Sequence, residues 1–178
     1  MPILRKALLI ALVLNLVGCA VVRVQRAKRL MAEANQLLEE DLKLEEKWVA
    51  EYGKAFRLEN RNLFPSNRED LRISGEKVTE VINESMRLNS QAAEKIDQAV
   101  TLFSDDKVRR GLAKLAASVR TQQEINNLFK EQMLLVSDAE IKDPKTFNEK
   151  FLRVAALIET KRAEVDDQKA DAKKLLGF

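Results

Sequence analysis

The chain of 178 residues contains no histidine and a single cysteine, and these two scarcities exclude most common reaction centres. Without histidine there is no Ser-His-Asp or Cys-His catalysis, no HExxH zinc motif, no Glu-x-x-His di-iron site and no CxxCH haem attachment. One cysteine allows neither an intrachain disulfide nor a structural zinc site built on thiolates. The glycine-rich GxxxxGK[ST] and GxGxxG phosphate loops are also missing. We therefore expect no enzyme, no metal site and no cofactor.

Adjacent acidic residues are the remaining candidates for general acid–base chemistry. Neighbouring residues in a helix point about 100° apart, so a pair in the sequence is not a pair in space. Such chemistry also needs a desolvated cleft that separates two pKa values, and a slim bundle offers little of one. We therefore interpret four acidic pairs of this kind as solvent-exposed surface residues. They are Glu39-Glu40, Glu45-Glu46, Asp105-Asp106 and Asp166-Asp167.

Proline and glycine are scarce as well, and this favours long helices. From residue 19 onwards there are two prolines and four glycines, while Ala, Leu, Glu, Lys, Arg and Gln dominate. Apolar residues recur at spacings of three and four nearly throughout, which is typical of amphipathic helices. The pattern predicts helices over about 22–63, 67–103, 106–136 and 144–176.

The breaks between these helices carry local signals of unequal strength. Pro65 ends the first helix, because the residue before a proline is pushed out of helical conformation. Ser104 resembles an N-cap, but no glycine or proline enforces that break, so one continuous helix is the alternative. Asp143 followed by Pro144 predicts a cap and a first helical residue, and Gly177 closes the last helix. Short connections imply antiparallel neighbours, so the expected fold is all-α, an elongated up-down-up-down four-helix bundle resembling a coiled coil.

The amino terminus has the three parts of a secretory signal. Arg5 and Lys6 form a positive region, and an apolar run from Ala7 to Val17 follows. The run ends in a stretch that resembles the lipobox of bacterial lipoproteins, with a fit at all four positions: Leu16, Val17, Gly18 and Cys19.

The resemblance covers only these first 19 residues. It implies that Cys19 is diacylated on sulfur, that residues 1–18 are cleaved off, and that the chain is attached to a membrane. Residues 19–26 would then be a lipidated segment near the membrane, and residues 27–178 the bundle. Because residue 20 is alanine and not the retaining aspartate, the resemblance implies the periplasmic side of the outer membrane in a cell with two membranes. In a cell with one membrane, it implies the outer face of that membrane.

Four basic residues follow the lipobox before the first acid, Glu33: Arg23, Arg26, Lys28 and Arg29. At the lipid surface each would add about 1 kcal/mol of attraction to anionic headgroups. The alternative is an uncleaved transmembrane helix, which these cations favour because they resist export. The apolar run from Ala7 to Val22 is 16 residues, however, and about 20 are needed to span a bilayer. From residue 19 onwards, 29 basic residues balance 28 acidic ones, which gives no reason to expect nucleic acid as a partner.

Two groups of residues are candidates for binding or for specific packing. If the helices alternate in direction, Asp41, Asn89 and Gln122 come near one level, with Arg162 about one turn away. We expect either a polar layer that fixes register or outward-facing side chains, and the alternative is an internal pocket for a small polar ligand.

The second group is an aromatic strip on the first helix, where Trp48, Tyr52 and Phe56 lie one above another. We expect core packing there, with the Tyr52 hydroxyl turned to water, and the alternative is a binding strip. Taken together, the sequence favours a membrane-anchored envelope lipoprotein that acts as a non-catalytic scaffold beside another envelope protein. The alternative function is a sensor-like bundle that binds a small molecule.

Overall fold

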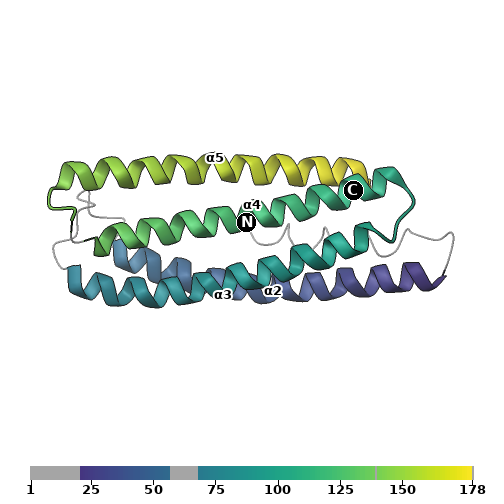
Figure 1. Cartoon of the computed structure of the whole chain (residues 1–178), viewed down its shortest axis with the longest axis horizontal. Helices are drawn as coiled ribbons and strands as arrows, with labels where there is room; N and C mark the ends of the chain where they lie inside the picture. The colour runs from purple at the N-terminus through teal and green to yellow at the C-terminus, as the bar shows by residue number, and fades with distance from the viewer. Residues whose placement is uncertain (1–20, 57–67, 139, 178) are drawn as a thin grey trace.

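The computed structural model describes residues 21–56, 68–138 and 140–177, and these residues are almost entirely helical. They form four helices and no strand: α2 (Val21–Phe56), α3 (Arg68–Val100), α4 (Asp106–Ser137) and α5 (Pro144–Leu176) (Figure 1). At 1.5 Å per residue, the 36 residues of α2 extend over about 54 Å. The all-α prediction is confirmed.

The helices pack in chain order, α2 against α3, α3 against α4 and α4 against α5. Figure 1 shows α4 running between α5 and α3, with α2 beside α3. Because consecutive helices reverse direction, the start of α2, the turn between α3 and α4, and the end of α5 lie at one end of the bundle. This is the elongated antiparallel four-helix bundle that the spacing of apolar residues predicts.

A tight turn separates α3 from α4, so the alternative of one continuous helix is excluded. The Leu102 amide donates to the carbonyl of Ala99 at 3.0 Å, and α3 ends at Val100 rather than at the predicted 103. The N-cap of α4 is Asp105 and not Ser104, since the Val108 amide donates to Asp105 Oδ1 at 3.0 Å. Both residue types cap well, and the backbone is extended at Asp105.

The boundaries of α5 match the sequence prediction. The Thr146 amide donates to Asp143 Oδ1 at 2.9 Å, and Pro144 is the first helical residue. Gly177 closes the helix in the left-handed region, with φ at 85°, and its amide donates to Lys173 O at 2.9 Å. The predicted end of the first helix near Pro65 lies outside the described residues.

The core consists of apolar clusters on either side of a polar level. Near the start of α2 the buried side chains are small or aliphatic, and they include Ala34, Ala92, Ile96 and Leu112. Towards the far end the buried side chains are larger: Trp48, Val78, Ile82, Met133, Phe147 and Phe151. Small side chains let the helices approach closely at the first end.

Candidate functional site

The lipobox residues Leu16, Val17, Gly18 and Cys19 lie outside the described residues, so acylation and cleavage remain predictions. The described chain begins at Val21, two residues after Cys19, and it is already helical there. No helix in the described ranges is long and apolar enough to cross a membrane.

The four basic residues after the lipobox lie in the first turns of α2. Arg23, Arg26 and Arg29 are exposed, and Lys28 is half-buried. Arg29 Nε lies 2.9 Å from a carboxylate oxygen of Glu33, and Lys95 Nζ of α3 lies 2.7 Å from the other. Hydrogen bonds from Lys95 and Arg29 lower the pKa of Glu33. One acid near the start of α2 is therefore shared by two cations.

A buried polar layer crosses the bundle between the apolar clusters, and it contains three of the four predicted residues. Asp41 and Asn89 are buried, and Gln122 is half-buried. The Ser85 hydroxyl of α3 donates to Asp41 Oδ1 of α2 and accepts from Asn126 Nδ2 of α4 at 2.9 Å. Gln122 Nε2 then donates to Asn126 Oδ1 at 3.2 Å. The layer is therefore a chain of hydrogen bonds that joins α2, α3 and α4.

Asn89 takes part in the layer through the backbone. Its Nδ2 donates to the Ser85 carbonyl at 3.1 Å, one turn earlier on α3. Sequence reasoning missed Ser85 and Asn126, which link the other members. A signal was present, because Ser85 lies four residues before Asn89 and Asn126 four residues after Gln122, on the same helix faces.

Arg162 lies elsewhere, which corrects the expectation that it reaches the layer. It is exposed, and its Nη1 lies 2.6 Å from Glu159 Oε1 on the same helix. Its guanidinium carbon lies 5.6 Å from the ring centre of Phe129, within cation–π range. Arg162 follows the buried Ile158 by four residues, so it lies at the edge of the buried stripe of α5, and its exposed guanidinium is on a flank of the helix.

Trp48 and Tyr52 of α2 pack into the core, as the sequence predicts. Trp48 is 2% exposed, and its ring centre lies 4.9 Å from that of Phe129 on α4. Tyr52 contacts the same Phe129 ring edge-on, with the centroids 5.2 Å apart. Phe56 is the last residue of α2, and its side chain lies outside the described part of the structure. Two of the three aromatic residues thus form a packed cluster with α4.

The hydroxyl of Tyr52 corrects one detail of the prediction, because it does not turn to water. It donates to Gln132 Oε1 of α4 at 2.6 Å, and Gln132 Nε2 donates onwards to the Phe151 carbonyl of α5 at 3.4 Å. Burial raises the pKa of Tyr52, and the charge of Arg162 acts weakly in the opposite direction. This second chain of hydrogen bonds connects α2, α4 and α5, and it lies further from the start of α2 than the polar layer does.

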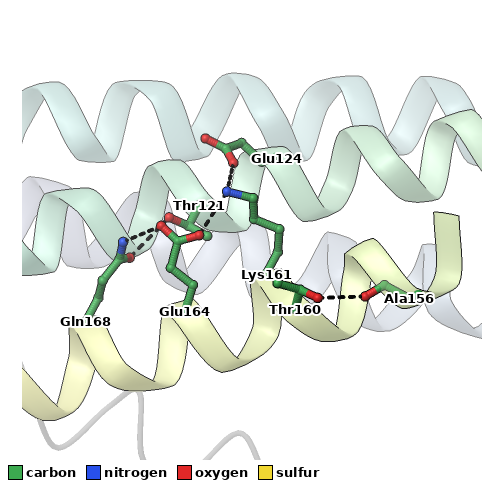
Figure 2. Close-up of polar contacts among 7 residues, drawn as sticks. All are labelled: Thr121, Glu124, Ala156, Thr160, Lys161, Glu164 and Gln168. Carbon is green, nitrogen blue, oxygen red and sulfur yellow. Dashed lines mark hydrogen bonds and ion pairs between the residues drawn. The ribbon is translucent and has the colours of Figure 1, made fainter. Parts of the chain in front are cut away.

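A third polar group ties α4 to α5 near the surface, and sequence reasoning missed it (Figure 2). Lys161 Nζ lies 2.7 Å from Glu124 Oε2 and 2.8 Å from Glu164 Oε2. Gln168 links the Thr121 hydroxyl, at 3.1 Å, to Glu164, at 3.0 Å. Hydrogen bonds from Lys161 to Glu124 and Glu164 raise the pKa of Lys161. The network adds polar contacts between α4 and α5 to the apolar packing of the two helices.

None of these groups forms a metal site, since the described residues hold no cluster of three or more potential ligands. A shallow open hollow lies on α2, and its lining comes from that helix alone: Lys43, Glu46, Lys47, Ala50 and Glu51. Asp41, Ser85 and Asn126 bond to one another across three helices, and Tyr52 bonds to Gln132 across two. Trp48 Nε1 and Asn148 Oδ1 are the buried side-chain atoms of the described residues that have no hydrogen-bond partner. The hydrogen bonding between helices favours a packed structural core.

Comparisons of the chain with protein-family models, with curated proteins and with solved structures find no match.

Proposed function

We propose that the chain is a lipid-anchored protein of the bacterial cell envelope, and that its helical bundle is a non-catalytic scaffold. It holds another envelope protein close to the membrane through a helix face, with no bond made or broken. The anchor is acylated Cys19, and nucleic acid is not a partner. The location is the periplasmic side of the outer membrane in a host with two membranes, and otherwise the outer face of the cell membrane.

The observation that supports this proposal best is that the described bundle lies close to Cys19 in the sequence. The first described residue, Val21, is already helical, and it follows Cys19 by two residues. Two or three acyl chains at Cys19 give stable membrane attachment. A rod of about 50 Å would then be held with its α2 start at the lipid surface.

The packing of the interior favours a scaffold over a receptor for small molecules. Tyr52 and Gln132 bond to each other, and Ser85 bonds to both Asp41 and Asn126. A small polar ligand would have to displace these partners, which are already positioned. Apart from Val22 near the start of the described chain, the large apolar side chains exposed on the described helices are the candidate contacts for a partner: Val49, Leu134, Leu152 and Leu157.

The anchor is tested by mass and by flotation with vesicles. We expect wild-type chain to lose residues 1–18 and gain the mass of the acyl groups, and we expect Cys19→Ser to do neither. Ala20→Ser, one residue further on, is the matched control and should be processed like wild type. The proposal is overturned if Cys19→Ser, or a globomycin-type inhibitor, leaves both the mass and the flotation unchanged.

The scaffold is tested by photo-crosslinking in intact cells. A crosslinking amino acid placed at Leu152, which is 59% exposed, should capture one defined envelope protein. The control positions are Lys150 and Arg153, which are exposed on the same helix but polar and point about 160° and 100° away from Leu152. Capture should also be lost in the Cys19→Ser background. Equal capture from all three positions would speak against a specific helix face.

A further inference from the structure

We infer that the end of the bundle where α2 begins is a cationic surface, built jointly by α2, α4 and α5, that binds anionic lipid headgroups. The inference deepens the proposed membrane function, since it adds a contact between the folded bundle and the lipid to the anchor at Cys19. The sequence places basic residues of α2 near the membrane, and only the fold brings those of α4 and α5 beside them.

Two ion pairs between helices establish that these segments share one end. Lys95 Nζ of α3 lies 2.7 Å from Glu33 of α2, which sets the start of α2 beside the end of α3. Lys114 Nζ of α4 lies 3.1 Å from Asp171 Oδ2 of α5, which sets the start of α4 beside the end of α5. Figure 1 shows the start of α2, the α3–α4 turn and the end of α5 together.

The charge at this end is predominantly positive. Nine basic side chains stand against the acidic Asp105 and Asp106 in the segments 21–30, 101–110 and 172–177, and the adjoining segments 91–100 and 168–171 add two basic and three acidic side chains. Together these segments carry 11 basic and five acidic side chains, whereas the rest of the chain from residue 19 carries 18 basic and 23 acidic ones, so the positive charge is concentrated here. The nine are Arg23, Arg26, Lys28, Arg29, Lys107, Arg109, Arg110, Lys173 and Lys174.

Most of these cations form no ion pair with an acid among the described residues. Arg110 Nε lies 3.0 Å from Asp106, and Arg29 pairs with Glu33. Asp105 is occupied by the cap of α4. Within the described ranges, no ion pair joins any of the other seven to an acid. These seven cations, which form the cationic end, are Arg23, Arg26, Lys28, Lys107, Arg109, Lys173 and Lys174.

Helix dipoles explain only part of this placement. Lys173 and Lys174 lie in the last turn of α5, where the dipole favours cations. Lys107 and Arg109 lie in the first turn of α4, where the dipole disfavours them. The first turn of the described α2 contains no acid, and Arg23 lies in it. Three of the seven cations, Arg23, Lys107 and Arg109, are thus in first turns, where an anion outside the bundle would offset the unfavourable dipole.

A lipid surface fits this end better than another polyanion. Cys19 lies only two residues before Val21 in the sequence, so the proposed acyl anchor and the cationic end belong to one contact. Val22 is 76% exposed among the cations, and apolar residues beside basic ones are typical of membrane interfaces. Juxtamembrane basic clusters bind anionic headgroups through charge, with a range set by the Debye length.

The test is lysine acetylation of the full acylated chain reconstituted in vesicles. The chain is reconstituted in phosphatidylcholine vesicles, with or without added phosphatidylglycerol, and treated with a small amount of a water-soluble acetylating reagent. The extent of acetylation of each lysine is then measured by mass spectrometry. We expect the anionic lipid to slow the acetylation of Lys107, Lys173 and Lys174 several-fold. The exposed lysines Lys142, Lys145 and Lys150, on the far end of the same molecule, should not change. About 1 M NaCl, where the Debye length is about 3 Å, should remove the protection.

A pair of charge reversals sharpens the test. Lys107→Glu with Arg109→Glu should weaken the protection of Lys173 and Lys174 across the helix boundary. The matched control, Lys142→Glu with Lys145→Glu, should leave that protection intact. All four side chains are exposed, so the fold should tolerate the changes.

Two results would overturn the inference. One is equal acetylation of the end lysines in neutral and anionic vesicles. The other is stronger protection by duplex DNA in solution than by anionic vesicles at the same phosphate concentration, which would make the surface a nucleic-acid site. Failure of the anchor has a different readout, because it appears as an unacylated mass before any vesicle is added.

Discussion

The hydroxyl of Ser85 on α3 donates a hydrogen bond to the buried carboxylate of Asp41 on α2. The same hydroxyl accepts a hydrogen bond from Asn126 of α4 at 2.9 Å, so one small side chain joins three helices. A shift of any of these helices by one turn would leave buried polar groups without partners, at the full cost of desolvation. The layer therefore favours a single register, which apolar packing alone specifies less sharply.

Replacing Ser85 tests this role of the layer. Ser85→Ala removes the donor to Asp41 and the acceptor for Asn126, so we expect a loss of about 1–3 kcal/mol in the free energy of unfolding. The control is Ser90→Ala on the same helix, where the side chain is half-buried and helix propensity favours alanine. Urea unfolding followed by far-ultraviolet circular dichroism measures both. Equal stability of the two variants would contradict the role given to Ser85.

Tyr52 gives a prediction for alkaline pH. Burial raises its pKa, so the neutral phenol is favoured in the folded chain relative to an unfolded value of about 10. The stability from this group is complete below pH about 10 and is lost as pH rises further. Tyr52 is the only tyrosine, so phenolate absorbance reports it alone. We expect the folded chain to show no phenolate at a pH where the chain in guanidinium is half ionised.

The variant Tyr52→Phe tests the hydrogen bond between the Tyr52 hydroxyl and Gln132. It leaves Gln132 Oε1 without the hydroxyl that donates to it at 2.6 Å, and we expect a cost of about 1–2 kcal/mol at neutral pH. Part of the alkaline loss of stability should disappear with the phenol. An unchanged alkaline profile in this variant would show that other groups cause the loss.

The ends of the helices depend on local sequence signals. These signals are clearest where only one residue nearby can act as the cap. Asp143 before Pro144 and the glycine at 177 predict both ends of α5 correctly. At the α3–α4 turn, Ser104 and Asp105 are both good caps, so the sequence does not decide between them. The structure selects Asp105, with α3 already ended at Val100.

The polar layer shows that the periodicity of the sequence predicts the level of a residue along the bundle but not the direction in which its side chain points. Alternating directions of the helices predict the level of Asp41 and Asn89 along the bundle, and the structure brings them to that level. Periodicity does not give the rotation of a helix about its axis, so Arg162 falls on a flank beside Phe129. Contacts between distant helices, such as that of Lys161 with Glu124, depend on that rotation as well and carry no local signal.

The cap of α5 gives a prediction for acidic pH. Hydrogen bonds from the Thr146 amide lower the pKa of Asp143, so its contribution to stability is present above pH about 4 and is lost as pH falls. Asn caps helices about as well as Asp. Asp143→Asn should therefore unfold like wild type at neutral pH but lose less stability between about pH 5 and pH 2. Asp143→Ala should be less stable at neutral pH, and parallel acid profiles for wild type and Asp143→Asn would contradict the assignment.

Two helical glycines give opposite predictions for the same substitution. A Cβ at Gly53 on α2 meets nothing within 4 Å, so Gly53→Ala should raise the free energy of unfolding by about 0.5–1 kcal/mol through helix propensity. A Cβ at Gly111 on α4 would lie 2.5 Å from Leu176 Cγ and 3.3 Å from Leu175 Cβ. The last turn of α5 would have to move, so we expect Gly111→Ala to lose the propensity gain and destabilise the bundle.

A double-mutant cycle tests whether contact with Leu176 causes the expected destabilisation by Gly111→Ala. Leu176→Ala removes the atoms closest to the added Cβ, so Gly111→Ala should be less destabilising in that background than in wild type. The coupling energy between the two positions should be of order 1 kcal/mol, as for residues in direct contact, and urea unfolding of the four chains measures it. Gly53→Ala combined with Leu176→Ala is the matched cycle without contact and should be additive. If Gly111→Ala alone stabilises as much as Gly53→Ala, the close approach of α4 and α5 at the cationic end does not exist in solution.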